Sequence, residues 1–198
     1  MKLFNRIAFV ILLLVTNSIS ARDVILEFKG AYFLPTNDIF KSMFHRGGAL
    51  YGPELTVQLC PESCLYGFAS VDYLKAHGRS IGECDPTNVQ LIPLAFGLKY
   101  FIPQWYDCVD FYLGLGFQAI DVRTKNCIAG SVTRFTNWGF GGIAKAGSYW
   151  YLPCNFVIDI FVDYSFVKVD RCGSSPCLDF PKANISGAIF GVGLGYKF

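Results

Sequence analysis

The chain has 198 residues, of which 53% are hydrophobic and only 16% are charged. Soluble domains usually contain about 25% charged residues, so this composition is apolar for a soluble protein. The formal net charge is only +2, which argues against a nucleic-acid-binding protein. The length suits a single domain, and after the N-terminus no stretch approaches the ~20 apolar residues of a membrane-spanning helix.

Residues 1–21 have the pattern of a cleaved secretory signal peptide. Lys2 and Arg6 precede a short apolar run, and small residues follow it at the expected cleavage point. We therefore expect residues 22–198 to form the mature, exported domain. Without Lys2 and Arg6, the basic residues equal the acidic residues in number. Export together with eight cysteines indicates an oxidising compartment.

Eight segments alternate apolar with polar or small residues, as strands do when successive side chains point to opposite faces. In the first segment, residues 24–34, Leu26 and Phe28 alternate with Glu27 and Lys29. The other segments, in chain order, are 49–60, 65–75, 89–102, 109–121, 135–152, 156–169 and 187–198. Each segment therefore has one apolar face and one polar or nearly bare face.

The connections between these segments alternate between long and short. The short connections contain Pro61, Pro103 and Pro153. The long connections are residues 35–48, 76–88, 122–134 and 170–184. Transmembrane barrels of the outer membrane have short turns on the periplasmic side and longer loops outside, so the alternation predicts two unlike ends.

The last segment ends in Tyr196, Lys197 and Phe198, with both aromatic residues on its apolar face. With this ending, the chain resembles the small eight-stranded bacterial outer-membrane barrels, the group of the OmpA transmembrane domain, OmpX and the opacity-type surface proteins. The resemblance implies an all-β, antiparallel, up-and-down transmembrane barrel in the outer membrane. It also implies that Tyr196 and Phe198 belong to the signal that the barrel-assembly machinery recognises.

The polar faces of the segments carry ten charged residues that a barrel would enclose. They are Glu27, Lys29, Glu54, Asp72, Lys99, Asp110, Lys145, Asp159, Asp163 and Lys197. An eight-stranded barrel is only wide enough for its own side chains, so we interpret these residues as a salt-bridge network that fills the interior. An ion path is the alternative. Inward glycines such as Gly193 would make room for large inward residues such as Tyr112.

The barrel topology sorts the eight cysteines by end. The short-turn end holds Cys60, Cys64, Cys108 and Cys154, and the long loops hold Cys84, Cys127, Cys172 and Cys177. An apolar band about 25 Å tall separates the ends, whereas bridged cysteines have Cα atoms within about 7 Å, so no disulfide should cross. Each set of four cysteines allows three pairings, so nine remain. One of them joins Cys60 to Cys64, Cys108 to Cys154, Cys172 to Cys177 and Cys84 to Cys127, and free thiols are the alternative.

No residue pattern predicts a catalytic centre, a cofactor site or a metal site. A hydrolase or acyltransferase set built from His77, Ser80 and Asp85, or from His45 and Ser42, is a minor alternative. The sequence favours a non-enzymatic barrel with a structural or adhesin-like role through its extracellular loops. The alternatives are a narrow channel, a lipid A acyl-modifying enzyme and a secreted lipocalin-like carrier.

The long connections contain more basic than acidic residues. An ordinary solvated loop surface explains this excess, and contact with the phosphates of lipopolysaccharide or with an anionic host surface is the functional alternative. The expected partners are therefore outer-membrane lipid and lipopolysaccharide, the barrel-assembly machinery, and a host or envelope ligand at the loops. Nucleic acid is not an expected partner, and the sequence leaves the oligomeric state open.

Overall fold

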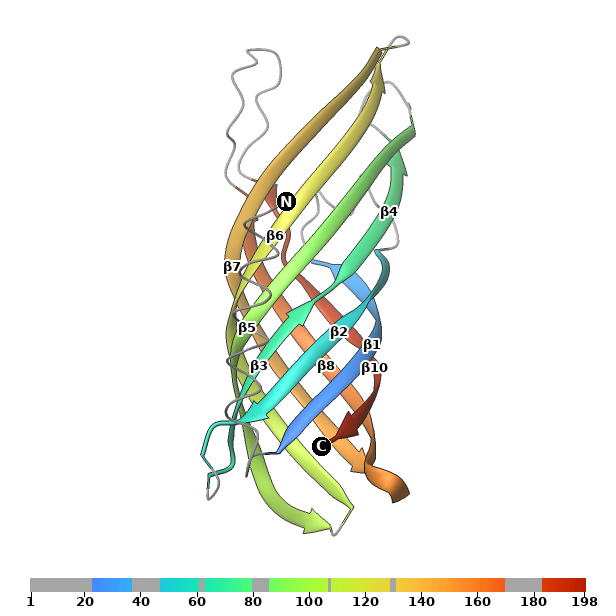
Figure 1. The fold of residues 1–198 in the computed structure, drawn as a ribbon. Helices are drawn as coiled ribbons and strands as arrows, with labels where there is room; N and C mark the ends of the chain where they lie inside the picture. Colours follow the sequence, from blue (N-terminus) through green and yellow to red (C-terminus); the bar gives the residue numbers. More distant parts are fainter. Residues whose placement is uncertain are drawn as a thin grey trace, which may run out of the picture.

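A computed structural model describes residues 23–36, 47–60, 63–79, 86–106, 108–128, 131–169 and 183–198. The expected signal peptide, residues 1–21, lies outside these ranges. Within them, no helix is long and apolar enough to cross a membrane. The described chain is almost entirely strand, and its strands form one antiparallel sheet that curls into a closed barrel (Figure 1).

The strands are β1 (Val24–Pro35), β2 (Gly48–Gln58), β3 (Leu65–Val71), β4 (Tyr73–Arg79), β5 (Pro86–Tyr106), β6 (Val109–Ile128), β7 (Ser131–Tyr151), β8 (Phe156–Val169), β9 (Ala183–Asn184) and β10 (Gly187–Lys197). Strands β3 and β4 keep one register against both β2 and β5, so they are two parts of one barrel strand. The two-residue β9 pairs with the end of β8 and leads into β10. The barrel wall therefore has eight strands, as predicted.

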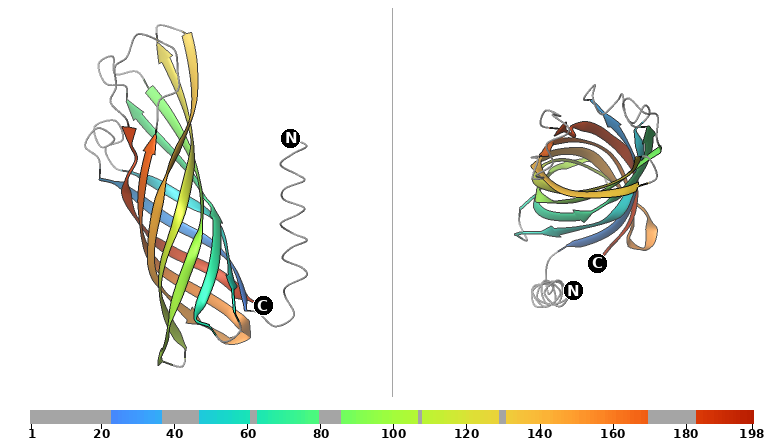
Figure 2. Two further views of the ribbon diagram at one scale, coloured as in Figure 1. Left: turned by 90° about the vertical axis from the view of Figure 1, so that its left-hand side faces the viewer. Right: turned by 90° about the horizontal axis from the view of Figure 1, so that it is seen from above.

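Pairing of the first and last strands closes the barrel. The ladder between β1 and β10 runs from Ile25 opposite Lys197 to Pro35 opposite Gly187, and the view along the axis shows the closed ring (Figure 2). Closure leaves no unpaired edge for aggregation or strand exchange. The predicted fold class, an antiparallel up-and-down barrel, is confirmed.

The two faces of the wall are divided as the alternation predicted. The outward side chains of Phe96, Leu115 and Phe117 are 61%, 72% and 70% exposed, whereas the inward Glu27 and Lys29 are buried. An exposed apolar outer wall is suited to lipid. A soluble lipocalin-like carrier would need the reverse arrangement, so this structure excludes that alternative.

The wall is much taller on one side than on the other. Strands β5, β6 and β7 have 21, 20 and 21 residues, and we call them the tall wall. Strands β1, β2, β8 and β10 have 12, 11, 14 and 11 residues, and we call them the short wall. Both walls begin near the same end, and the tall wall extends further at the other end (Figures 1 and 2).

The tall wall corrects two of the expected long loops. Residues 122–134 were expected to be a loop, but β6 continues to Ile128 and β7 begins at Ser131. Likewise, the expected loop 76–88 is shortened by β4, which ends at Arg79, and β5, which begins at Pro86. The apolar alternation fades in these residues, but the pairing of the backbones continues through them. The sequence pattern records the alternation and not the pairing.

Aromatic side chains mark two levels on the outer wall. At the end with the short turns, Tyr196 packs against Phe198 with ring centroids 4.9 Å apart and against Phe156 at 5.6 Å. Towards the other end, Tyr164 and Phe166 lie 4.4 Å apart. Aromatic residues favour the two membrane–water interfaces, so these levels delimit the apolar band.

Candidate functional site

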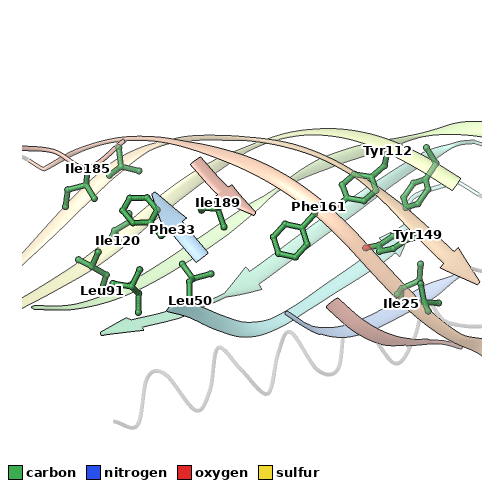
Figure 3. Close-up of a cluster of buried hydrophobic side chains, with 14 residues drawn as sticks. Ile25, Phe33, Leu50, Leu91, Tyr112, Ile120, Tyr149, Phe161, Ile185 and Ile189 are labelled. Atoms are coloured by element: carbon green, nitrogen blue, oxygen red, sulfur yellow. The ribbon is translucent and has the colours of Figure 1, made fainter. Parts of the chain in front are cut away.

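The interior of the barrel, which we call the lumen, is filled by three layers of side chains. The layer nearest the long loops, the loop-end apolar layer, consists of Phe33, Leu50, Leu74, Leu91, Ile120, Ile185 and Ile189. The layer nearest the short turns, the turn-end aromatic layer, consists of Ile25, Phe101, Tyr112 and Tyr149. Figure 3 shows that these two groups lie towards opposite ends of the barrel.

A charged layer lies between the two apolar groups along the strands. It consists of Glu27, Lys29, Glu54, Lys99, Lys145, Asp159 and Asp163. All seven side chains are buried. Buried charges are costly unless they are paired and hydrogen-bonded, so the arrangement of partners decides whether this layer closes the lumen.

Glu54 on β2 is the centre of the charged layer. Its Oε1 is 3.1 Å from the Lys29 ammonium and also contacts that of Lys99, and its Oε2 is 3.0 Å from that of Lys145. These lysines come from β1, β5 and β7. One carboxylate therefore joins strands of the short wall to strands of the tall wall across the lumen.

Two further carboxylates balance the lysines from the side of β8. Asp159 lies 3.0 Å from the Lys29 ammonium, and Asp163 lies 2.7 Å from that of Lys145. The Lys29 ammonium also sits 4.4 Å from the centre of the Phe161 ring. Such cation–π contacts are strengthened where water is excluded, and Phe161, between Asp159 and Asp163 on β8, packs within the charged layer.

Two tyrosines connect the charged layer to the turn-end aromatic layer. The Tyr149 hydroxyl accepts a hydrogen bond of 2.8 Å from the Lys99 ammonium and donates one of 2.6 Å to Glu27. The Tyr112 hydroxyl donates to Asp159 at 3.1 Å. The alternation placed both tyrosines on the inner face, but it could not predict these partners.

Glycines create the space that the charged layer occupies. A Cβ atom at Gly193 would lie 2.7 Å from Glu27 Oε2 and 3.3 Å from atoms of Lys29 and Asp159. A Cβ atom at Gly114 would lie 3.2 Å from Lys99 Cγ. The predicted role of inward glycines as space for large neighbours therefore applies directly to the charged layer.

Three of the ten charges expected in the lumen lie away from the centre of this layer. Lys197 pairs with Asp23 at 2.7 Å at the short-turn end, where both side chains are partly exposed. Asp110 is half-buried near the same end, in the second position of β6. Asp72 is half-buried at the interruption between β3 and β4, where its backbone N–H donates to Pro93 at 2.9 Å.

The four cysteines expected at the short-turn end lie there, but they are free thiols in the structure. The expected bonds Cys60–Cys64 and Cys108–Cys154 are therefore not formed. Cys60 is exposed, whereas Cys64 is half-buried and packs against the interior, so these two side chains occupy different environments. Cys108 and Cys154 are both exposed.

The remaining candidate residues lie in parts of the chain that the structure does not describe. For the cysteines these are Cys84, Cys172 and Cys177, together with the side chain of Cys127 on β6. For the alternative hydrolase sets these are Ser42, His45, Ser80, Asp85 and the side chain of His77. Both sets therefore stay predictions.

The loop-end apolar layer is the feature of the lumen that the sequence reasoning missed. Phe33 and Leu50 share the inward face with charged residues on β1 and β2. Both are at most 5% exposed. The available signal was the change from charged to apolar residues along the inner face of β1, from Glu27 and Lys29 to Phe33.

The fold is that of known outer-membrane barrels. Over 90% of this chain it is similar to Neisserial surface protein A (16% identity, 98% of that chain, TM-score 0.54) and to OprG of Pseudomonas aeruginosa (14%, 96%, 0.57). Over 89% of the chain it is similar to Ail of Yersinia pestis in complex with a heparin analogue (14%, 97%, 0.50). No protein-family model matches the chain, and no curated protein sequence matches it either.

These findings agree with the outward apolar wall and with the resemblance seen in the sequence. The molecule is an eight-stranded transmembrane barrel of the bacterial outer-membrane type. The predicted outer-membrane location is confirmed. The similar proteins differ in their names and ligands, so the common fold does not by itself define a role.

Proposed function

We propose that this protein is a non-enzymatic outer-membrane barrel that acts through its outer and extracellular surfaces, in a structural or adhesin-like role. The observation that best supports this proposal is the filled lumen. Charged and apolar layers succeed one another along its axis, and each contains side chains from strands on both walls. A lumen filled in this way supports a closed body, which leaves the external surfaces to carry function.

Two further observations favour an interaction at the loop end. The tall wall extends the β6–β7 hairpin well beyond the short wall (Figure 2). Basic residues are frequent on this extension, including Arg123, Lys125 and Arg134. The similar barrel Ail binds a heparin analogue, and an anionic glycan is a ligand that a basic extension would attract.

Conductance in planar bilayers tests the closed body. The purified barrel should give no stable conductance steps, while a trimeric porin measured in the same bilayers serves as the positive control. Steady conductance steps from a barrel whose folding has been verified would contradict the closed lumen and would favour the narrow-channel alternative.

Cell adhesion tests the adhesin-like role. Bacteria that display the full chain should bind immobilised heparin better than bacteria that display a chain lacking residues 124–135. In the shortened hairpin, Arg123 and Thr136 become neighbours in the chain and form the new turn. Folding must therefore be checked, and a folded barrel is recognised by the change in its gel mobility when the sample is heated. Equal adhesion of two folded forms would leave the structural role as the better description.

A further inference from the structure

The outer face at the loop end carries a row of polar side chains that crosses four strands. The register places Lys75 opposite Gln90, Gln90 opposite Arg123, and Arg123 opposite Thr136. Directly opposite residues of an antiparallel pair share a face, and Lys75, Arg123 and Thr136 are exposed. We call these four residues the polar row. One step further from the band, the register pairs Lys125 with Arg134.

The polar row lies directly beyond the apolar band. The next outward residues towards the band are Ile92, Asp121 and Trp138, which are also opposite one another. Trp138 is half exposed, and tryptophan favours the membrane–water interface. Because a strand rises about 3.4 Å per residue, Arg123 lies about 7 Å further along β6 than this level, on the side where lipid headgroups begin.

Asp121 and Arg123 form a pair with an unusual distribution of burial. Asp121 is only 5% exposed although it belongs to the outward row of β6, whereas the Arg123 side chain is 55% exposed. Arg123 Nε and Nη2 lie 2.9 Å and 2.8 Å from Asp121 Oδ2. Both contacts use one edge of the guanidinium, so its other edge is held towards the outside.

The second oxygen of this carboxylate is the unexplained group. Asp121 Oδ1 is buried and has no hydrogen-bond partner among the residues that the structure describes. A buried carboxylate oxygen without a donor is costly. This oxygen is covered by the wall itself, so a molecule seated on the polar row meets the exposed Arg123 guanidinium.

We propose that Arg123, Asp121 and Trp138 form a binding site for the phosphate-bearing headgroup of an outer-leaflet lipid. Arg123 binds the phosphate with the free edge of its guanidinium, whose planar donors match phosphate oxygens. Asp121 orients Arg123, and Trp138 packs at the junction with the acyl chains. Lys75, two strands away and therefore about 10 Å from Arg123, adds a second positive charge.

The lipid source follows from the position of the site. The row borders an apolar surface on which Phe117 and Phe140 are 70% and 68% exposed, so a ligand with acyl chains covers both parts at once. A soluble anion would use only Arg123. The proposal rests on the membrane-spanning barrel and is independent of the adhesin-like role, since it needs neither the hairpin tip nor a host ligand.

Lipid retention measured by native mass spectrometry tests the site. The full chain is expressed in bacteria, extracted from outer membranes in mild detergent, and titrated with diphosphoryl lipid A. Arg123→Gln should weaken retention about tenfold, the effect of losing one charge-assisted contact, and Asp121→Asn should weaken it by less. The matched control is Lys197→Gln, which removes the same charge from a partly exposed base on β10 at the short-turn end; it should change retention less than about twofold.

Each outcome decides the proposal, provided that the variants still shift on a gel when heated. Unchanged retention in Arg123→Gln overturns it, and equal losses in Arg123→Gln and Lys197→Gln overturn it by showing a mere effect of net charge. Displacement of lipid A by millimolar inorganic phosphate would show a soluble-anion site and would also overturn it. Selective loss in Arg123→Gln, without displacement by phosphate, is the result that the site requires.

Discussion

The tall wall and the short wall are built from the same alternation, but they are held in place differently. Within the tall wall, β6 and β7 pair without a shift from Val109 opposite Trp150 to Ile128 opposite Ser131. These contacts are local in sequence. The short wall instead depends on the pairing of β1 with β10 and on Glu54, which reaches Lys99 and Lys145 on the tall wall.

The two walls therefore depend on different kinds of contact for their stability. A hairpin of neighbouring strands closes a short loop at little entropic cost, so the tall wall can extend beyond the membrane without a partner across the lumen. The short wall joins the two ends of the chain, and long-range contacts inside the lumen hold that closure. Changes in the lumen should therefore affect the whole barrel, whereas changes on the outer rim should remain local.

The largest effect is expected from Glu54→Leu, which breaks the link between the walls. It leaves three buried lysines without their common carboxylate, and removal of one side of a buried charge network typically costs about 3–5 kcal/mol. The urea unfolding midpoint of the refolded barrel in detergent should fall accordingly. Lys197→Met is the matched control, because its pair with Asp23 is partly exposed and should contribute about 1 kcal/mol or less.

A midpoint for Glu54→Leu within error of the unchanged protein would show that the lumen is wet and that the walls are not joined by these charges. The alternative, a narrow channel with an ion path along these charged residues, would then gain support.

The next effect is expected in the loop-end apolar layer. Leu91 on the tall wall is 2% exposed and packs in this layer, so Leu91→Ala should cost about 2–5 kcal/mol by leaving a cavity. Thermal unfolding followed by circular dichroism measures the change. Leu115→Ala, on the same wall but 72% exposed to the outside, is the control and should cost less.

If both leucine variants lose equal stability, the loop-end apolar layer is not a packed core, and packing in the lumen does not stabilise the tall wall. The volume-conserving Leu91→Met should recover most of the loss.

Deletion of Phe198 should separate assembly of the short wall from its stability. The side chain is 65% exposed and its backbone N–H donates to Val24 at 2.8 Å, so the unfolding of barrels already assembled should change by only about 1 kcal/mol. If Phe198 belongs to the assembly signal, quantitative immunoblotting should show less protein in the outer-membrane fraction while secretion is unchanged. Phe198→Tyr keeps the terminal aromatic ring and should restore the level; normal levels in the deletion would remove the assembly role.

The smallest effect is expected at the short turns that join the strands below both walls. Cys60 is exposed and carries a free thiol, so Cys60→Ser should change stability by only about 0.5 kcal/mol. Alkylation and peptide mapping without reduction should recover a modified Cys60. A loss of about 2 kcal/mol or more, the usual effect of removing a native disulfide, would instead support the bond to Cys64.

The number of strands, their order and the face of each side chain follow from the amino-acid sequence. Glu27 and Lys29 face inward and Leu26 and Phe28 face outward because the alternation of a strand is a local property of its backbone. The ends of the barrel follow in the same way, since short turns and long connections can be counted along the chain. The outer-membrane fold is a consequence of these local facts.

Which inward residues meet depends on the closed barrel. The contacts of Glu54 with Lys29, Lys99 and Lys145 depend on the stagger between strands after closure, which alternation does not record. The height of the tall wall depends on hydrogen bonds between neighbouring strands, which continue after the apolar alternation fades. The burial of Asp121 beside Arg123 is of the same kind, because a residue on the outward row is covered only when side chains from its own and neighbouring strands lie over it.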